Sequence, residues 1–274
     1  MTTLAGVIGS PIAHSLSPAI FTAAFEATGL DWEYTAFEVG EADAPAFLQR
    51  LRSGEVEGVS VTMPDKAAVI PALDELSPVA GDLGAVNCVV RDGERLVGHN
   101  TDGDGFVDAL RLDDGIELAG RRCAVLGAGG AGRAVARAIG AAGATSVVIV
   151  NRSVDRAAAA AGLAGSVGSV GSPGSVADAD VVVNTTSLGM GDDGRIPLDE
   201  ALLREGQVVV DIVYHPLVTP LLAVAADKGC RTVGGLGMLV HQAGHAFRHW
   251  TGLEPPIAAM RAGAEAALAA RGGA

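Results

Sequence analysis

Positive charge, cysteine and long apolar runs are all scarce in this chain. Its 274 residues include 19 Lys and Arg against 32 Asp and Glu, for a formal net charge of -13 at pH 7. A general surface for nucleic acid or for an anionic membrane is therefore not expected, and an anionic ligand must be held by a few placed cations. Lys66 is one of only two lysines, so it does not belong to a generic solvating set.

The three cysteines, Cys88, Cys123 and Cys230, lie in or beside apolar segments. Their number and spacing fit neither a disulfide framework nor a metal site, so we expect reduced core residues, no metal and a cytoplasmic protein. No apolar segment approaches the ~20 residues needed to cross a bilayer, and the first residues lack the basic and apolar parts of a secretion signal. We expect neither membrane insertion nor secretion.

Strand-like and helical segments alternate along nearly the whole chain, which predicts an α/β fold with mainly parallel sheets. The length favours two domains, and the polar segment at 113–115 is a candidate boundary. Expected strands lie at 4–8, 32–39, 58–61, 123–126, 146–150, 180–183, 207–213 and 230–233, with a hairpin formed by 87–90 and 95–97. Expected helices lie at 18–29, 42–52, 64–76 with an interruption near Pro71, 103–112, 219–229 and twice within 236–270.

A glycine-rich turn follows the expected strand at 123–126. Gly127, Gly129 and Gly132 precede an Ala- and Val-rich helical segment, a pattern typical of a strand, a tight turn and a helix N-terminus that binds a pyrophosphate. An NAD site would place Asp or Glu at the end of the next strand, but Asn151 and Arg152 stand there. Because Arg can bind a 2′-phosphate through charge-assisted bonds, the sequence favours NADP. The alternative is another Gly-rich turn with Arg152 on a solvated face.

Three further clusters carry candidate chemistry. Ser15 and Ser17 lie between the first strand and a helix, where two hydroxyls can bind a carboxylate or Ser17 can simply cap the helix. Thr62 and Lys66 follow the strand at 58–61, with Lys66 in the first turn of the expected helix. Asp102 either caps the next helix or pairs with Lys66 to move the proton that an alcohol releases on becoming a ketone.

The sequence resembles the shikimate/quinate dehydrogenase family through nine ordered blocks. The first reads Gly-Ser-Pro-Ile-Ala-His-Ser-Leu-Ser-Pro, and the nine lie at 9–18, 60–66, 84–88, 98–105, 127–131, 151–153, 184–190, 211–222 and 235–243. The resemblance implies reversible reduction of 3-dehydroshikimate to shikimate with NADPH, in aromatic amino-acid precursor synthesis. It also implies an N-terminal α/β substrate domain of residues 1–103 and 238–274, to which the C-terminal helices return, and a Rossmann-like NADP domain of residues 104–237.

The resemblance assigns roles to individual residues. Lys66 and Asp102 would be the catalytic pair. Substrate-binding residues would be Ser15, Ser17, Ser60, Thr62, Asn87, Tyr214 and Gln242. Cofactor-binding residues would be Gly127, Ala128, Gly129, Gly130, Ala131, Asn151, Arg152, Ser153, Arg156, Thr186, Met190, Gly235 and Met238. A small-molecule substrate is implied as partner, and a homodimer is one option.

The chain departs from the family pattern at a few positions. Ser60 replaces the usual Asn, so a water or a repositioned neighbour must fill the space. Ser153 replaces Thr and keeps the hydroxyl, while Phe21 and Thr22 stand where the family often has His and Asn. The alternatives are a quinate or aminoshikimate dehydrogenase, or a non-catalytic NADP-binding regulator. The presence of both Lys66 and Asp102 argues against the regulator.

Overall fold

The computed structural model describes residues 2–272 and divides into two compact units. Unit 1 comprises the residues through Thr101 and those from Val240 onward, and unit 2 comprises Asp102–Leu239. Residues 113–115, expected from the sequence as a boundary, lie inside unit 2. The chain leaves unit 1 directly after Thr101 and returns to it within helix α9 (Leu236–Thr251), so the second unit is an insertion in the first.

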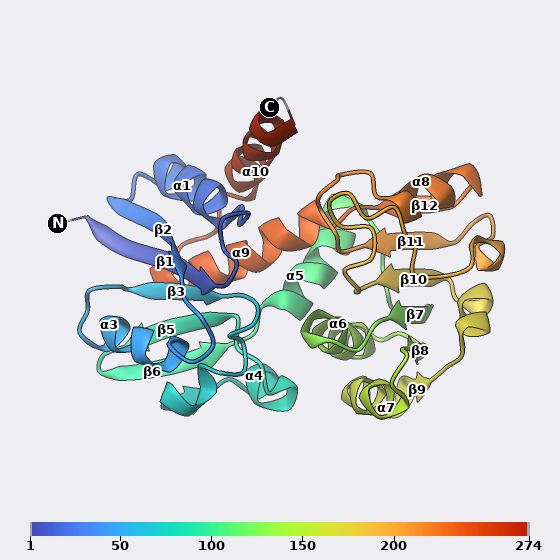
Figure 1. Ribbon diagram of the computed structural model, residues 1–274, viewed down its shortest axis with the longest axis horizontal. Helices are drawn as coiled ribbons and strands as arrows, with labels where there is room; N and C mark the ends of the chain where they lie inside the picture. The colour runs from blue at the N-terminus through green and yellow to red at the C-terminus, as the bar shows by residue number, and fades with distance from the viewer. Residues whose placement is uncertain (1, 273–274) are drawn as a thin grey trace. The chain divides into compact units, whose positions relative to one another are not determined.

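Unit 1 contains a six-stranded sheet in the order β2-β1-β3-β5-β6-β4 (Figure 1). The strands are β1 (Thr3–Gly9), β2 (Trp32–Glu38), β3 (Gly58–Val61), β4 (Glu75–Leu76), β5 (Cys88–Asp92) and β6 (Arg95–His99). Strand β1 runs parallel to β2 and β3, and β5 forms the expected antiparallel hairpin with β6. Gly93 has φ 62° in the turn of that hairpin, a conformation in which glycine is unstrained.

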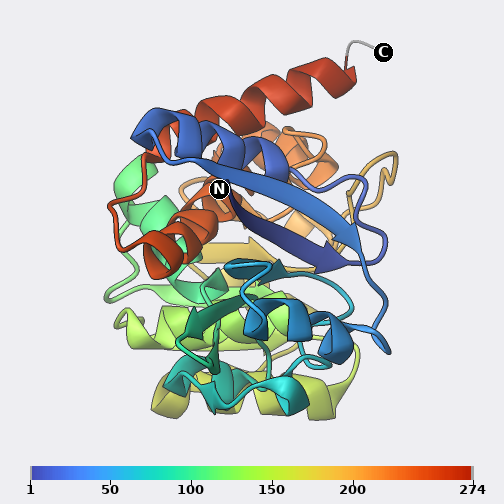
Figure 2. The same ribbon diagram turned by 90° about the vertical axis from the view of Figure 1, so that its left-hand side faces the viewer.

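The helices of unit 1 come from both ends of the chain. They are α1 (Ser17–Thr28), α2 (Ala44–Phe47), α3 (Gln49–Arg52), α4 (Pro78–Leu83), most of α9, and α10 (Ile257–Gly272). Figure 2 shows α1 and α10 side by side, which confirms that the C-terminal helices return to the first domain. Gly263 makes the approach possible, because a Cβ there would lie 2.6 Å from the Ala19 carbonyl oxygen.

Unit 2 contains a six-stranded, fully parallel sheet in the order β12-β11-β10-β7-β8-β9. The strands are β7 (Arg122–Leu126), β8 (Ser146–Val150), β9 (Gly168–Val170), β10 (Val181–Asn184), β11 (Val208–Asp211) and β12 (Arg231–Val233). The helices are α5 (Asp102–Asp108, continued by a π-helical turn, Ala109–Asp113), α6 (Gly130–Ala141), α7 (Val154–Leu163) and α8 (Pro220–Asp227). Short 3₁₀ turns follow α7 and flank β10.

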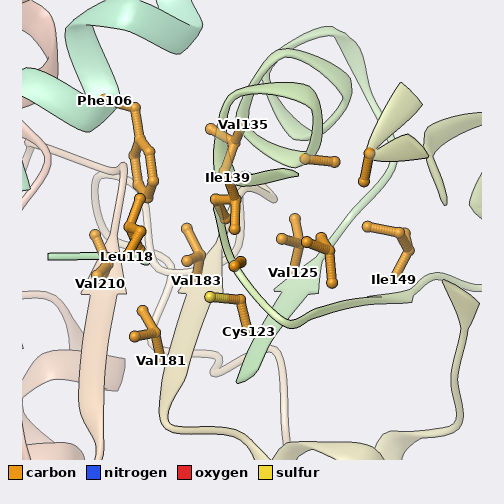
Figure 3. Packing of buried hydrophobic residues seen from close by; sticks show 14 of the residues in the cluster. Phe106, Leu118, Cys123, Val125, Val135, Ile139, Ile149, Val181, Val183 and Val210 are labelled. Carbon is orange, nitrogen blue, oxygen red and sulfur yellow. The ribbon is translucent and has the colours of Figure 1, made fainter. Parts of the chain in front are cut away.

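Valine-rich strands explain the parallel sheet of unit 2. Parallel strands covered on both faces are continuously apolar rather than alternating, and β10 is buried at every position. One face packs against α5 and α6 through the buried cluster in Figure 3, which includes Phe106, Val125, Val135 and Ile139. The free thiol of Cys123 lies within this cluster, where burial raises its pKa to about 12. This is the behaviour expected of a reduced core cysteine.

The helix predicted over 64–76 does not form. Turns replace its first half, and a 3₁₀ turn (Ile70–Ala72) and strand β4 replace the rest. Pro71 cannot donate a helical hydrogen bond and disfavours helical geometry at Ile70. The chain instead pairs with β6, where the Asp74 amide donates to the Leu96 carbonyl over 2.9 Å. The expected helix at 42–52 is also divided, into α2 and α3.

Asp65, near the start of the segment 64–76, is a buried carboxylate. It has no exposed surface, and neither carboxylate oxygen has a hydrogen-bond partner among residues 2–272. Burial, with a smaller contribution from Glu41, raises its pKa. Protonated Asp65 therefore makes its full contribution to the free energy of unfolding below the ordinary carboxyl pKa. That contribution is lost as pH rises through the raised pKa of the folded protein.

We expect Asp65→Asn to increase the free energy of unfolding at pH 7 by roughly 1–3 kcal/mol, because an amide is less costly to bury unpaired than a carboxylate ion. The gain should shrink as pH falls towards 4. Denaturant unfolding followed by tryptophan fluorescence tests this, since both tryptophans, Trp32 and Trp250, lie in unit 1. Asp31→Asn, at an exposed carboxylate, is the control; equal effects of the two substitutions would contradict the prediction.

Candidate functional site

The glycine-rich turn joins β7 to α6 and has the geometry of a dinucleotide-binding loop. Gly127 has φ 106°, and its amide donates to the Val150 carbonyl over 2.9 Å, which ties the ends of β7 and β8 together. A Cβ on Gly132 would lie 2.5 Å from the Gly127 carbonyl oxygen. Only glycine therefore lets the first turn of α6 pack this closely on the end of the strand.

Open space lies above the middle of the turn. A Cβ on Gly129 or Gly130 would meet no atom within 4 Å, and no side chain caps the N-terminus of α6 at Gly129. The free amides and the helix dipole there favour an anion. A pocket of about 270 Å³ beside the turn is lined by Ala128, Gly129, Gly130, Arg133, Arg156 and Ala159.

Two guanidinium groups line this pocket. Arg156, assigned to the cofactor by family resemblance, comes from the first turn of α7, and Arg133, one of the few cations that the sequence offers for an anionic ligand, comes from the first turn of α6. In a chain with net charge -13, two arginines around one pocket are suited to an anionic ligand.

The segment from Asn151 to Ser153 links β8 to α7. The Asn151 side-chain amide donates to the Ser153 carbonyl over 2.9 Å, and the Ser153 hydroxyl caps α7 by accepting from the Arg156 amide over 3.4 Å. The Arg152 side chain is exposed and does not line the pocket. Asn151 and Ser153 thus fix the start of the helix that presents Arg156.

Past the ends of β10, β11 and β12 lie the remaining expected cofactor residues and one expected substrate-binding residue, Tyr214. Thr186 donates to the Asn184 side-chain oxygen over 2.7 Å, and Asn184 donates to the buried Asp211 carboxylate over 2.9 Å. Met190 is half-exposed, Tyr214 and Met238 are half-buried, and Gly235 is buried. Thr185, which was not predicted from the sequence, donates to the Leu126 carbonyl over 2.8 Å. Its hydroxyl also packs against Gly127, where a Cβ would lie 2.8 Å from it.

A buried polar cluster in unit 1 joins residues far apart in the sequence. The Thr101 amide donates to the Asn87 side-chain oxygen over 2.8 Å, and the Thr101 hydroxyl donates to the Gln242 carbonyl over 3.0 Å. The Asn87 side-chain amide donates to the Gln242 side-chain oxygen over 3.4 Å. The structure therefore brings two predicted substrate-binding residues together, and Thr101, which was not among the predicted residues, holds them.

Ser15 and Ser17 lie at the start of α1, in a loop held from two sides. The Ser10 hydroxyl and the Ile12 amide donate to the Glu38 carboxylate over 2.7 and 3.0 Å. Arg271, on α10, donates to the carbonyls of His14 and Ser15 over 2.9 and 3.2 Å. Ser17 is not the helix cap; it is the first helical residue, and its amide donates to the Ser15 hydroxyl over 3.2 Å.

Ser60 and Thr62 lie at the end of β3, and Lys66 follows in the turns after it. Lys66 is half-buried, and its carbonyl accepts from the Val86 amide over 2.8 Å. No helix forms there, so Lys66 lies in a turn and not in the first turn of a helix as expected. Asp102 is buried and begins α5 as the first residue of unit 2, directly after Thr101.

Residues 2–272 contain neither a cluster of His, Cys, Asp and Glu placed to hold a metal ion nor a helix long and apolar enough to cross a membrane.

Three family models match the chain in order. They are the shikimate dehydrogenase substrate binding domain at residues 7–89, shikimate / quinate 5-dehydrogenase at 110–189, and the shikimate 5'-dehydrogenase C-terminal domain at 235–262. Together they include the segments that carry Ser15, Lys66, the glycine-rich turn and Gln242. Asp102 lies between the first two matches.

Individual relatives match nearly the full chain. A shikimate dehydrogenase (NADP(+)) of Geobacter metallireducens is 45% identical over 97% of this chain and 97% of its own. The structure of shikimate 5-dehydrogenase from Thermus thermophilus with NADP(H) and shikimate is 41% identical, with a TM-score of 0.92 over 97% of this chain and 100% of its own. A quinate dehydrogenase from Corynebacterium glutamicum with NAD is 34% identical, with a TM-score of 0.88 over 97% and 99%. The chain therefore belongs to the shikimate dehydrogenase family.

Proposed function

We propose that this protein is an NADP-dependent oxidoreductase that reversibly reduces 3-dehydroshikimate to shikimate, a step of aromatic amino-acid precursor synthesis. The observation that carries the proposal is the cluster around Thr101. It holds the polar side chains of Asn87 and Gln242 and is followed directly by the buried carboxylate of Asp102. Two consecutive residues thus carry the proposed chemistry. Thr101 holds side chains suited to ring hydroxyls, and Asp102 supplies a carboxylate suited to proton transfer.

The described residues fit NADP. The open backbone at Gly129 and Gly130, at the N-terminus of α6, suits a pyrophosphate. Arg156 and Arg133, which line the adjacent pocket, and the exposed Arg152 suit the 2′-phosphate. Asn151 in place of an acidic residue removes the group that would repel that phosphate. Thr186, Met190, Tyr214, Gly235 and Met238 are assigned by family resemblance to the nicotinamide end.

Bound NADPH supplies the hydride, and the chain must supply the proton and hold the substrate. Ser15, Ser17 and Ser60 bind the ring carboxylate, and Thr62, Asn87 and Gln242 bind ring hydroxyls. Lys66 and Asp102 exchange the proton with the oxygen that alternates between carbonyl and hydroxyl. Residues 1–103 and 238–274 form the substrate domain in this proposal, and residues 104–237 form the NADP domain.

The location and the alternative substrates follow from the same features. Free, buried thiols at Cys88 and Cys123 suit the reducing cytoplasm. Quinate is the nearest alternative substrate, but it adds a hydroxyl on the carbon that bears the carboxylate. That group crowds Ser15 and Ser17, whose positions the loop contacts to Glu38 and Arg271 restrict.

We expect shikimate with NADP to give the highest kcat/KM among the four combinations of shikimate or quinate with NADP or NAD. Arg152→Ala should raise KM for NADP roughly tenfold or more and change KM for NAD little, since only NADP has a 2′-phosphate to lose. Arg111→Ala, which removes an exposed guanidinium paired with Asp108, is the control. Equal kcat/KM with both cofactors would refute the cofactor assignment, and faster turnover of quinate would refute the substrate assignment.

We expect Lys66→Met and Asp102→Asn each to lower kcat by roughly 10²- to 10⁴-fold while NADP affinity, measured by fluorescence titration, stays near normal. The double variant should lose less than the product of the two single losses, because residues that act as a unit are not additive. Near-normal kcat in either single variant would rule out the pair as the proton-transfer group.

We expect Glu38→Ala and Arg271→Ala each to raise KM for shikimate about two- to tenfold with a smaller change in kcat, because each releases one side of the loop that carries Ser15. Steady-state kinetics at saturating NADP measure both constants. Glu33→Ala, at an exposed carboxylate on the same strand as Glu38, should leave KM unchanged. If KM stays constant in both loop variants, the two contacts do not position Ser15.

A further inference from the structure

Tyr34 contacts one of the predicted substrate-binding hydroxyls. It is the one buried residue of β2, with 6% of its surface exposed. Its hydroxyl donates to the Ser60 Oγ over 2.9 Å. A single phenol thus connects β2 to the end of β3.

The neighbouring strands leave space for this connection. Tyr34 lies opposite Ala5 on β1, and Ala5 lies opposite Gly58 on β3. Ser60 is two residues beyond Gly58 and therefore on the same face of the sheet. Because the residues between them in this row are small, the Tyr34 side chain can extend along the sheet to Ser60.

Aromatic packing fixes the Tyr34 ring. Its ring stacks on Phe21 with a centroid distance of 4.4 Å and an interplanar angle of 8°, and the Trp250 ring lies 6.2 Å away. Phe21 has no exposed surface. The Trp250 ring packs directly on Gly58, where a Cβ would lie 2.5 Å from the ring. Close packing therefore restricts both the Phe21 and the Trp250 rings, which flank Tyr34. The Tyr34 hydroxyl is therefore held at a defined place beside Ser60.

Burial raises the pKa of Tyr34 far above the range in which enzymes work, so the phenol keeps its proton and can donate it. When Tyr34 donates to Ser60, the Ser60 hydroxyl proton is left for another acceptor. A hydroxyl that already accepts a hydrogen bond is also a stronger donor. Its best partner is an anionic oxygen, since hydrogen bonds to charged groups are the strong ones.

We propose that Tyr34 is a positioning residue of the substrate site, which holds Ser60 so that its hydroxyl donates to the substrate carboxylate. This inference rests on the proposed function. It also identifies what occupies the space next to the short Ser60 side chain: the repositioned neighbour expected from the sequence is Tyr34. Phe21, a second departure from the family pattern, stacks on the same ring.

The test is Tyr34→Phe in the full-length enzyme, which removes the hydroxyl and keeps the stacked ring. KM for shikimate should rise roughly two- to tenfold, as expected for one lost hydrogen bond, while kcat and KM for NADP stay within about twofold. Ser60→Ala should give a similar rise, and the double variant should show less than the product of the two, because each single change already breaks the same link. With shikimate methyl ester, which has no carboxylate charge, the rise caused by Tyr34→Phe should be much smaller.

Thr251→Val is the matched control, because it removes a hydrogen-bonded hydroxyl from the same unit outside the site. Unchanged KM for shikimate in Tyr34→Phe, or an equal rise for shikimate and its methyl ester, would overturn the positioning role. These results are separate from the proposed function itself, which is tested on the unaltered enzyme by its oxidation of shikimate and by its choice of cofactor.

Discussion

The hydrogen bonds of Thr101 are the constraint on which the substrate side of this protein depends. They join the start of β5, through Asn87, to α9, through Gln242, across 155 residues of sequence. Thr101 is also the last residue of this segment of unit 1, and Asp102, the first residue of unit 2, follows it directly. A buried polar cluster costs free energy unless each member is hydrogen-bonded. The bonds from Thr101 and Asn87 to Gln242 therefore favour one position of α9 against the substrate side of unit 1.

In the proposed function, an acidic chain binds two anionic ligands at separate places. At the glycine-rich turn, backbone amides, a helix N-terminus and guanidinium groups are all suited to phosphate, which carries high charge. At the start of α1, the proposed binding groups for a single carboxylate are hydroxyls, and Arg271 contacts the backbone carbonyls of the loop. Hydroxyls have little attraction for distant anions, so we expect selectivity there to depend on their placement by neighbours such as Glu38 and Tyr34.

The parts of the fold that follow from local backbone chemistry could be predicted from the sequence. The turn at Gly127, the hairpin at Asp92 and Gly93, and the apolar parallel strands were all expected, because glycine conformation and strand burial are encoded within a few residues. The segment at 64–76 could not be predicted in this way. Its composition suits a helix, but Pro71 and the pairing of β4 with β6 decide otherwise, and that pairing depends on residues about twenty positions away.

The same distinction applies within the site. Motifs predict roles for Ser15, Ser17, Ser60 and Gln242, but no local pattern indicates that Tyr34 reaches Ser60 or that Arg271 reaches the Ser15 carbonyl, 256 residues away. These supporting contacts arise only when α1, α10 and the sheet pack together. If Ser15 binds the substrate as proposed, a substitution on α10 alters substrate affinity through the loop of Ser15 without touching the ligand. Discrimination between cyclic hydroxy acids then depends on these supporting contacts as well as on the motif residues.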